Sequence, residues 1–179
     1  LLCNDILAEV ERRMDDERYM LLAIEEAKES LREGNNGFGA VIVRNGEVIA
    51  SEHDREDTQQ DPTSHAELNA IRAASRKYGK KLADCVLFST HEPCPMCAAA
   101  IVWAKIPTVV YGYSICDAIG QGRKRMEISC ADIFEQSGAQ VETRAGVLKE
   151  ACAILYRKDV RSEIERLRHA DDDALHALN

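Results

Sequence analysis

The chain lacks several features that would place it in a membrane or in a secreted class. None of its 179 residues lies in a run approaching the ~20 apolar residues that a membrane helix needs. Its first residues lack a basic region followed by an apolar one, so we expect no secretory signal, no membrane partner and a cytoplasmic protein. The sequence also lacks internal repeats, low-complexity tracts and linkers. With 45% hydrophobic residues it should form a single domain over 1–179, with the core at about 15–158 and a helix with a frayed acidic tail at 159–179.

Basic charge and closely spaced cysteines are also scarce. The chain has 23 basic and 31 acidic residues and a net charge of −8, which disfavours a long polyanionic partner but leaves a local basic patch possible. Only Cys94 and Cys97 of the seven cysteines form a close pair. The odd count fits a reducing cytosol better than a disulfide framework, and most of the other cysteines are expected to be small buried hydrophobes.

The most informative stretch runs from His65 to Cys97. It contains His65-Ala66-Glu67 and later Pro93-Cys94-Pro95-Met96-Cys97. One imidazole and two thiolates are good zinc ligands, and three protein ligands leave a tetrahedral ion one open position, as in a catalytic site. Water there becomes a nucleophile, because the metal lowers its pKa from about 15.7 toward neutrality. Glu67 lies two residues from His65 and can take the proton. The alternative, a structural zinc staple, usually needs a fourth ligand that neither block supplies.

The order of predicted elements favours an α/β fold. Strands and helices alternate, which predicts three layers with helices on both faces of a central mixed five-stranded sheet. Asn45-Gly46 predicts a tight hairpin between the first two strands. Strands are expected over 38–43, 48–50, 85–89, 108–112 and 140–143, and helices over 6–10, 15–33, from 64 or 65 onward, 96–105, 128–136 and 147–167. Residues 53–60 and 114–125 are expected to be loops.

The predicted helix boundaries place the metal ligands at two helix starts. Asp61-Pro62-Thr63 ends a loop just before His65. Pro95 suits the first turn of the helix that continues over 96–105, so Cys94 and Cys97 lie at its N-terminus. Helix N-termini carry free amide groups and the positive end of the dipole, which favours a thiolate. Two helix starts meeting at one ion would make a coherent site.

These residues resemble the zinc-dependent cytidine deaminase superfamily, whose signature is H-x-E followed by P-C-x-x-C. The resemblance covers about Phe38 to Leu155 and is strongest in the blocks 38–43, 61–67 and 92–97. In motif these look most like bacterial guanine deaminases and related nucleoside deaminases, and the tRNA adenosine deaminases share much of the pattern. The resemblance implies a cytidine-deaminase-like fold, a Zn²⁺ cofactor and hydrolytic release of ammonia with Glu67 as the proton shuttle.

The resemblance also implies substrate-binding roles for several residues. Phe38 would pack on the base, the backbone amide of Ala66 would hold the ring, and Trp103 would line the base pocket. Asp117, in Cys116-Asp117-Ala118, would contact a purine and help to move protons. The alternatives are ordinary core packing for Phe38 and Trp103 and a loop carboxylate for Asp117.

Asp54 departs from the family pattern. Related deaminases usually have Asn eleven residues before the His ligand, where its amide binds the base or sugar. An Asn side chain offers a donor and an acceptor, whereas an ionised Asp offers acceptors only. The ligand group that faces Asp54 should therefore be a donor, or Asp54 must be protonated. A mismatched buried polar pair costs about 1–3 kcal/mol, enough to change substrate choice and to leave guanine open as the substrate. The alternative is a shifted loop with Asp54 in solvent.

Three functions remain open at this point. The favoured one is a deaminase of a free nucleobase or nucleoside, guanine-like purines first and cytosine-type bases also possible. The second is a tRNA adenosine deaminase, for which the basic cluster Arg123-Lys124-Arg125 is the best feature, unless it is merely a solvated loop. The third is a non-catalytic zinc-binding subunit, which should have lost Glu67. Relatives pair through helices near the metal site, so we expect a homodimer by resemblance.

Overall fold

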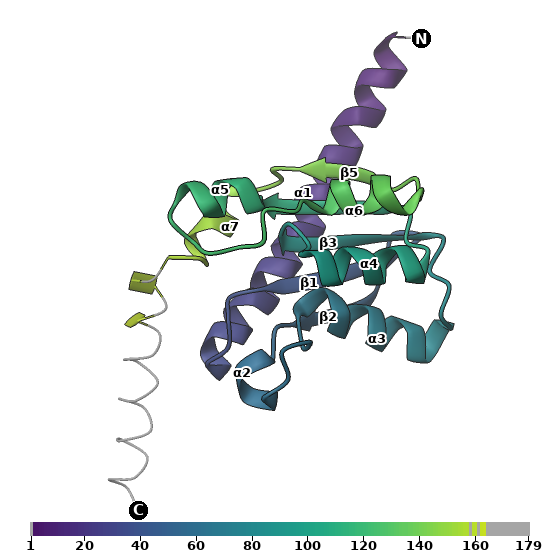
Figure 1. Cartoon of the computed structure of the whole chain (residues 1–179). Coiled ribbons are helices and arrows are strands. Elements are labelled where there is room, and N and C mark those ends of the chain that lie inside the picture. Colours follow the sequence, from purple (N-terminus) through teal and green to yellow (C-terminus); the bar gives the residue numbers. More distant parts are fainter. Residues whose placement is uncertain (1, 158, 161, 164–179) are drawn as a thin grey trace, which may run out of the picture.

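The computed structural model describes residues 2–157, 159–160 and 162–163 (Figure 1). A five-stranded sheet lies at its centre, in the order β2-β1-β3-β4-β5. The central strand β3 runs antiparallel to β1 and parallel to β4, so the sheet is mixed, as predicted. The strands are β1 (Gly39–Arg44), β2 (Glu47–His53), β3 (Cys85–His91), β4 (Thr108–Tyr113) and β5 (Glu142–Ala145).

Side chains that alternate along the strands divide the core between the two faces of the sheet. Ala40 and Ile42 of β1 pack in one cluster, and their neighbours Val41 and Val43 pack in the other. The first cluster is covered by α3 (Ala66–Tyr78), α4 (Pro95–Ala104) and α6 (Cys130–Ser137), and the second by α1 (Leu2–Glu33) and α7 (Lys149–Ile154). This arrangement is the three-layer α/β/α fold that the sequence predicts.

The hairpin and the cysteines follow the sequence analysis closely. Asn45 and Gly46 both have positive φ, 51° and 80°, which suits the two-residue turn between β1 and β2. Cys85, Cys130 and Cys152 are free and buried, whereas Cys116 is free and exposed. None of the helices in the described ranges is long and apolar enough to cross a membrane.

The N-terminal helix differs from the prediction. A short helix at 6–10 and a second from Asp15 or Asp16 were expected, but α1 is one helix of 32 residues. Residues 11–14, Glu-Arg-Arg-Met, are good helix formers and contain no breaker, so nothing ends the helix there. Its first turns project beyond the sheet, and Ile6 is 62% exposed (Figure 1).

Two predicted loops contain helices, and the last predicted helix is shorter. Residues 114–125 include α5 (Ile115–Gly120), which Ser114 caps by accepting a hydrogen bond from the Asp117 amide. Residues 53–60 end β2 and contain α2 (Glu56–Gln59). The helix expected over 147–167 is interrupted: α7 ends at Ile154, a turn brings Tyr156 into the core, and the described residues 159–160 and 162–163 are helical again. The predicted frayed tail from Asp171 lies outside the described residues.

The close packing of α1 on β1 gives a stability test. A Cβ at Gly39 would lie 2.0 Å from the Ala23 carbonyl oxygen, so Gly39→Ala should push α1 off the sheet and lower the free energy of unfolding by about 1–3 kcal/mol. Denaturant unfolding followed by circular dichroism measures this.

Gly120→Ala is the matched control, because a Cβ there meets nothing within 4 Å. Its free energy of unfolding should stay within about 1 kcal/mol of the parent protein. Equal stability of the Gly39→Ala and Gly120→Ala proteins would contradict the packing argument.

Candidate active site

The predicted metal ligands lie at the starts of two helices on one side of the sheet. His65 is the N-cap of α3, and Cys94 is the N-cap of α4. Both have extended backbones, with φ of −71° and −64°, so each side chain lies just before its helix. Pro95 occupies the first helical turn, and Cys97 follows within it. The sequence therefore placed these three residues correctly relative to their helices.

Distances within this cluster fit a tetrahedral zinc ion. His65 Nδ1 lies 3.6 Å from Cys94 Sγ and 3.6 Å from Cys97 Sγ. Ligands at the usual zinc distances of about 2.05 Å for nitrogen and 2.3 Å for sulfur lie about 3.6 Å apart across a tetrahedral angle. The donor set of one imidazole and two thiols also suits zinc.

Protons and zinc compete for the atoms of this cluster. A hydrogen bond from the Cys97 thiol lowers the pKa of Cys94 to about 4, and the same bond together with burial raises the pKa of Cys97. The hydrogen bond with Cys94 also raises the pKa of His65 to about 9. These residues therefore hold protons that zinc would displace, so zinc binding should weaken as the pH falls.

Glu67 lies directly beside this cluster. It is the second residue of α3 and is only 5% exposed. Ser89 Oγ on β3 donates a hydrogen bond to Glu67 Oε1 at 3.1 Å and so fixes the carboxylate. Burial, with the nearby Cys94, raises the pKa of Glu67. A carboxylate with a raised pKa can both accept and return a proton near neutral pH.

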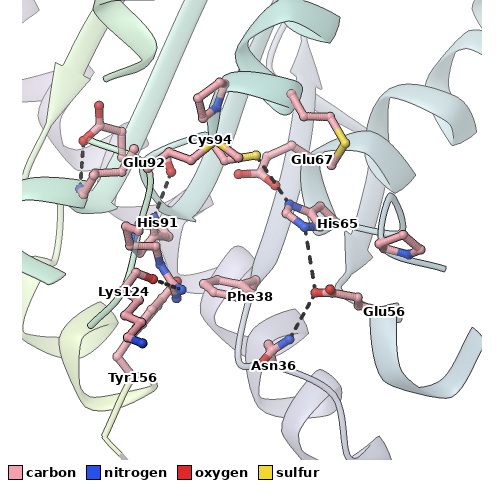
Figure 2. Close-up of a pocket in the computed structure, with 16 residues that line it drawn as sticks. Asn36, Phe38, Glu56, His65, Glu67, His91, Glu92, Cys94, Lys124 and Tyr156 are labelled. Atoms are coloured by element: carbon pink, nitrogen blue, oxygen red, sulfur yellow. Dashed lines mark hydrogen bonds and ion pairs between the residues drawn. The ribbon is translucent and has the colours of Figure 1, made fainter. Parts of the chain in front are cut away.

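A cavity of about 440 Å³ opens in front of the cluster (Figure 2). His65, Glu67 and Cys94 lie at its inner end. Phe38 and Tyr156 supply aromatic walls, with their ring centroids 4.9 Å apart. The volume and the aromatic lining suit a flat heterocycle.

Glu56 forms a second acidic wall that the sequence analysis missed. It begins α2, and its Oε2 lies 3.8 Å from His65 Nε2 and accepts a hydrogen bond from Asn36 Nδ2 at 3.4 Å (Figure 2). A carboxylate near the outer nitrogen of a metal-ligating histidine helps to orient the ring. The sequence analysis missed Glu56 because residues 53–60 were predicted to be a loop. A loop has no periodic pattern that indicates which way a side chain points.

His91 and Tyr156 were also missed as cavity residues. Their rings stack with centroids 4.7 Å apart. His91 Nδ1 lies 2.8 Å from the Glu92 carbonyl oxygen, and burial lowers the pKa of His91 to about 4. His91 is therefore neutral and donates from Nδ1. Tyr156 lies far along the chain and reaches the cavity only because of the turn after α7.

Glu92 holds the surrounding helices in place. Its Oε2 accepts from the Ile115 amide at 2.9 Å, and its Oε1 accepts from the Cys130 amide at 3.0 Å. These are the first residues of α5 and α6, so one buried carboxylate binds two helix N-termini. The glutamate of the Glu92-Pro93-Cys94 motif thus fixes the loop that carries a metal ligand.

The structure brings only some of the expected substrate residues to the cavity. Phe38 lines it, and Ala66 is buried between His65 and Glu67 at the start of α3. Trp103 is 81% exposed on α4 and does not line it. Asp117 does not line it either, because its side chain accepts from Lys149 Nζ at 2.8 Å and from Ser114 Oγ at 2.6 Å.

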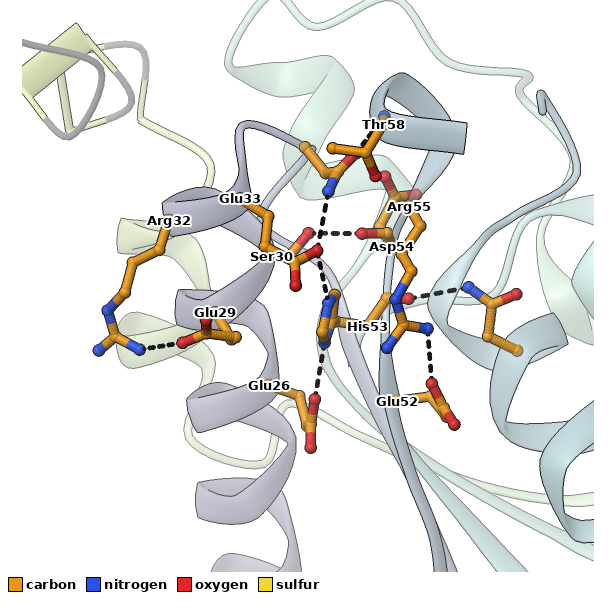
Figure 3. Close-up of polar contacts among 12 residues, drawn as sticks. Glu26, Glu29, Ser30, Arg32, Glu33, Glu52, His53, Asp54, Arg55 and Thr58 are labelled. Atoms are coloured by element: carbon orange, nitrogen blue, oxygen red, sulfur yellow. Dashed lines mark hydrogen bonds and ion pairs between the residues drawn. The ribbon is translucent and has the colours of Figure 1, made fainter. Parts of the chain in front are cut away.

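Asp54 is fully buried next to the site, rather than in solvent. Oxygens of Asp54 and Glu56 and a nitrogen of His65 all lie within 4.8 Å of one another. Ser30 Oγ of α1 donates to the Asp54 carbonyl at 2.9 Å and anchors the segment (Figure 3). Asp54 Oδ1 accepts from the Glu56 amide at 3.3 Å, and Oδ2 has no hydrogen-bond partner in the described part of the chain. Burial raises the pKa of Asp54 to about 6.

Comparison with known proteins agrees with this geometry. A family model for the cytidine and deoxycytidylate deaminase zinc-binding region matches residues 13–113, which include the whole metal cluster and Glu67. The chain belongs to this deaminase family. It therefore carries the family's zinc-binding region, and His65, Cys94 and Cys97 form the cluster that fits the ion.

Individual relatives of this deaminase have different substrates. A guanine deaminase of Bacillus subtilis (strain 168) is 42% identical over 111 residues, 61% of this chain and 71% of that protein. A tRNA-specific adenosine deaminase of the same strain is 38% identical over 138 residues, 76% of this chain and 83% of that protein. A structure from a study of A-to-I editing by tRNA:A34 deaminases has a TM-score of 0.67 at 31% identity and covers 77% of this chain and 98% of its own.

These comparisons establish a hydrolytic deaminase and leave its substrate to other evidence. Because relatives of this chain are tRNA-specific, its net charge of −8 is not evidence against a nucleic-acid substrate.

Removal of one thiolate tests the metal cluster. Cys94→Ala should lose its zinc, because two protein ligands bind the ion far more weakly than three. Metal analysis of the purified protein should give roughly one zinc per chain for the parent and almost none for the variant.

Cys116→Ala is the control, since Cys116 is a free exposed cysteine outside the cluster. Full zinc content in the Cys94→Ala protein would contradict the assignment of this ligand.

Proposed function

We propose that this deaminase acts on a small aminated heterocycle, a purine-like nucleobase or its nucleoside, and releases ammonia. The observation that carries the proposal is the position of Glu67, buried beside the His65 and Cys94 cluster at the inner end of an aromatic-walled cavity. A cavity of about 440 Å³ suits one base with its sugar.

The protein groups divide the reaction between them. His65, Cys94 and Cys97 would hold a zinc ion, which would lower the pKa of a water molecule toward neutrality. Glu67 accepts a proton from that water while the water oxygen attacks the ring carbon that bears the amino group. Glu67 then returns this proton to the neighbouring ring nitrogen. It next carries the second water proton from the new hydroxyl group to the amino group, the C–N bond breaks, and ammonia leaves. Ser89 holds the carboxylate in position throughout. The substrate gains a carbonyl, and water supplies its oxygen.

Phe38 and Tyr156 position the base in this proposal. Their rings lie on the cavity wall, and flat heterocycles stack on aromatic faces. The buried wall also excludes bulk water, which strengthens the electrostatic interaction between Glu67 and the reacting atoms.

Loss of the carboxylate tests the proton shuttle. Glu67→Gln should keep its zinc and its fold but lower kcat by about 100- to 10,000-fold, because the amide cannot carry the proton. Ammonia release from guanine, adenine, cytosine and their nucleosides measures this and identifies the preferred substrate.

Glu135→Gln, on the exposed side of α6, provides a matched control and should keep full activity. Turnover at the parent rate by the Glu67→Gln protein would remove Glu67 from the mechanism.

Asp54 is the residue we expect to set substrate choice. Its buried acceptor oxygens favour a donor on the substrate, such as the extra amino group of 2,6-diaminopurine in place of the carbonyl of guanine. Asp54→Asn should raise kcat/KM for guanine relative to kcat/KM for 2,6-diaminopurine by about 10-fold or more.

Asp57→Asn, on the exposed side of α2, is the control for a change of charge near the site. An unchanged ratio for Asp54→Asn would show that Asp54 does not contact the base.

A tRNA substrate is the second candidate. Lys124 and Arg125 line the cavity, and the chain is 38% identical to a tRNA-specific adenosine deaminase over 138 residues. Retained RNA on native purification and steep salt dependence of its binding would favour this candidate. A non-catalytic subunit is the weakest candidate, since Glu67 is present and buried in the site.

A further inference from the structure

Three consecutive cations, Arg123, Lys124 and Arg125, lie along the main cavity and a smaller one beside it. Lys124 and Arg125 line the main cavity, and Arg123 and Arg125 line a smaller one beside it. Within the described ranges none of the three forms an ion pair with a carboxylate, whereas Arg44, Arg55 and Arg144 all do. In a chain with a net charge of −8, this is a local excess of unneutralised positive charge.

Arg125 is held in place by groups other than carboxylates. Its guanidinium carbon lies 5.8 Å from the ring centroid of Phe38 and 5.5 Å from that of Tyr156. Its Nη1 also donates to the Lys124 carbonyl at 3.1 Å. Cation–π contacts position the guanidinium and leave its charge unneutralised. The planar guanidinium forms no ion pair within the described ranges, and its fork of donors suits the oxygens of a phosphate.

The smaller cavity continues the base-binding cavity toward these cations. The two share Asn36, Phe38, Arg125 and Tyr156, and the smaller one adds Arg123 and Arg157. Arg157 is paired with Asp159 at 2.5 Å, so Arg123 and Arg125 supply the positive charge of the smaller cavity that no carboxylate pairs within the described ranges. A substrate stacked on Phe38 would thus extend an attached group directly into this second cavity.

We propose that Arg123, Lys124 and Arg125 bind the phosphate of a nucleoside monophosphate whose base lies in the main cavity. This inference rests on the proposed deaminase function and specifies its substrate class. A phosphate monoester carries about −1.5 to −2 charges near neutral pH, which two or three cations can match. Glu56 on the facing wall repels an anion and so directs the phosphate away from the metal end.

A small monoester fits these observations better than an RNA strand. The three cations line two adjoining cavities of about 440 and 60 Å³, and the smaller one has space for a single phosphate group rather than for a strand.

The experiment compares matched substrates by ammonia release. Guanosine, adenosine and cytidine are each assayed beside their 5′-monophosphates. For the accepted base, the KM of the monophosphate should be about 10-fold or more below that of the nucleoside, because charge-assisted hydrogen bonds add to binding. Arg123→Ala/Lys124→Ala should remove this difference by raising the KM of the monophosphate to that of the nucleoside. Arg125→Gln, tested separately, should also reduce it.

Lys80→Ala/Lys81→Ala is the matched control, because it removes two exposed positive charges from a segment that lines neither cavity. It should keep the preference for the monophosphate. A loss of preference in this control equal to that in Arg123→Ala/Lys124→Ala would reduce the effect to net charge and overturn the proposal.

Direct binding separates this inference from the proposed reaction. The monophosphates, and more weakly inorganic phosphate, should raise the Tm of the parent protein and not that of Arg123→Ala/Lys124→Ala. Such binding without ammonia release from any compound would support the phosphate site and overturn the proposed reaction.

Two outcomes overturn the phosphate site alone. One is ammonia release from a free base or nucleoside with no preference for the monophosphate. The other is RNA binding that depends on Arg123 and Lys124 while nucleoside and monophosphate have equal KM values, which would assign these cations to RNA.

Discussion

The approach of His65 to the two cysteine sulfurs, at 3.6 Å each, is the contact on which the rest of the site depends. His65 and Cys94 cap different helices, and the packing of those helices on one another and on one face of the sheet fixes how their N-termini meet. A shift of either helix by an ångström would take the cluster outside the distances that zinc requires. It would also separate Glu67, on the same turn as His65, from the reacting water.

Much of the buried polar structure serves to prevent such a shift. Glu92 binds the first amides of α5 and α6, and Ser89 holds Glu67 from β3. Ser30 of α1 anchors the segment that carries Asp54 and Glu56. Each contact ties a loop or helix start to a rigid element, so catalytic groups are held by secondary structure rather than by flexible loops. The acidic metal end and the cationic outer end then give the cavity two chemically different halves.

The parts of the fold that were predicted correctly have strong local signals. The Asn45-Gly46 turn, the apolar strands and Pro95 at the start of α4 each constrain their own backbone. The errors fell where local signals are weak or absent. Residues 11–14 contain no breaker, so α1 runs through them, and α5 depends on the Ser114 cap within a glycine-containing stretch. Trp103 and Asp117 were assigned by resemblance, and packing places both away from the cavity. The homodimer remains a prediction.

The sequence by itself predicted the chemistry that we propose: the ligand set, the shuttle carboxylate and the replacement of the usual Asn by Asp54. These are properties of residue type and short spacing, which the covalent chain already contains. Only the tertiary structure decided which distant side chains share the cavity. Glu56, His91, Arg125 and Tyr156 come from separate segments, and their meeting depends on how helices pack on the sheet. Such contacts leave no periodic pattern in the sequence, because the residues next to each side chain in the chain do not specify its distant partners.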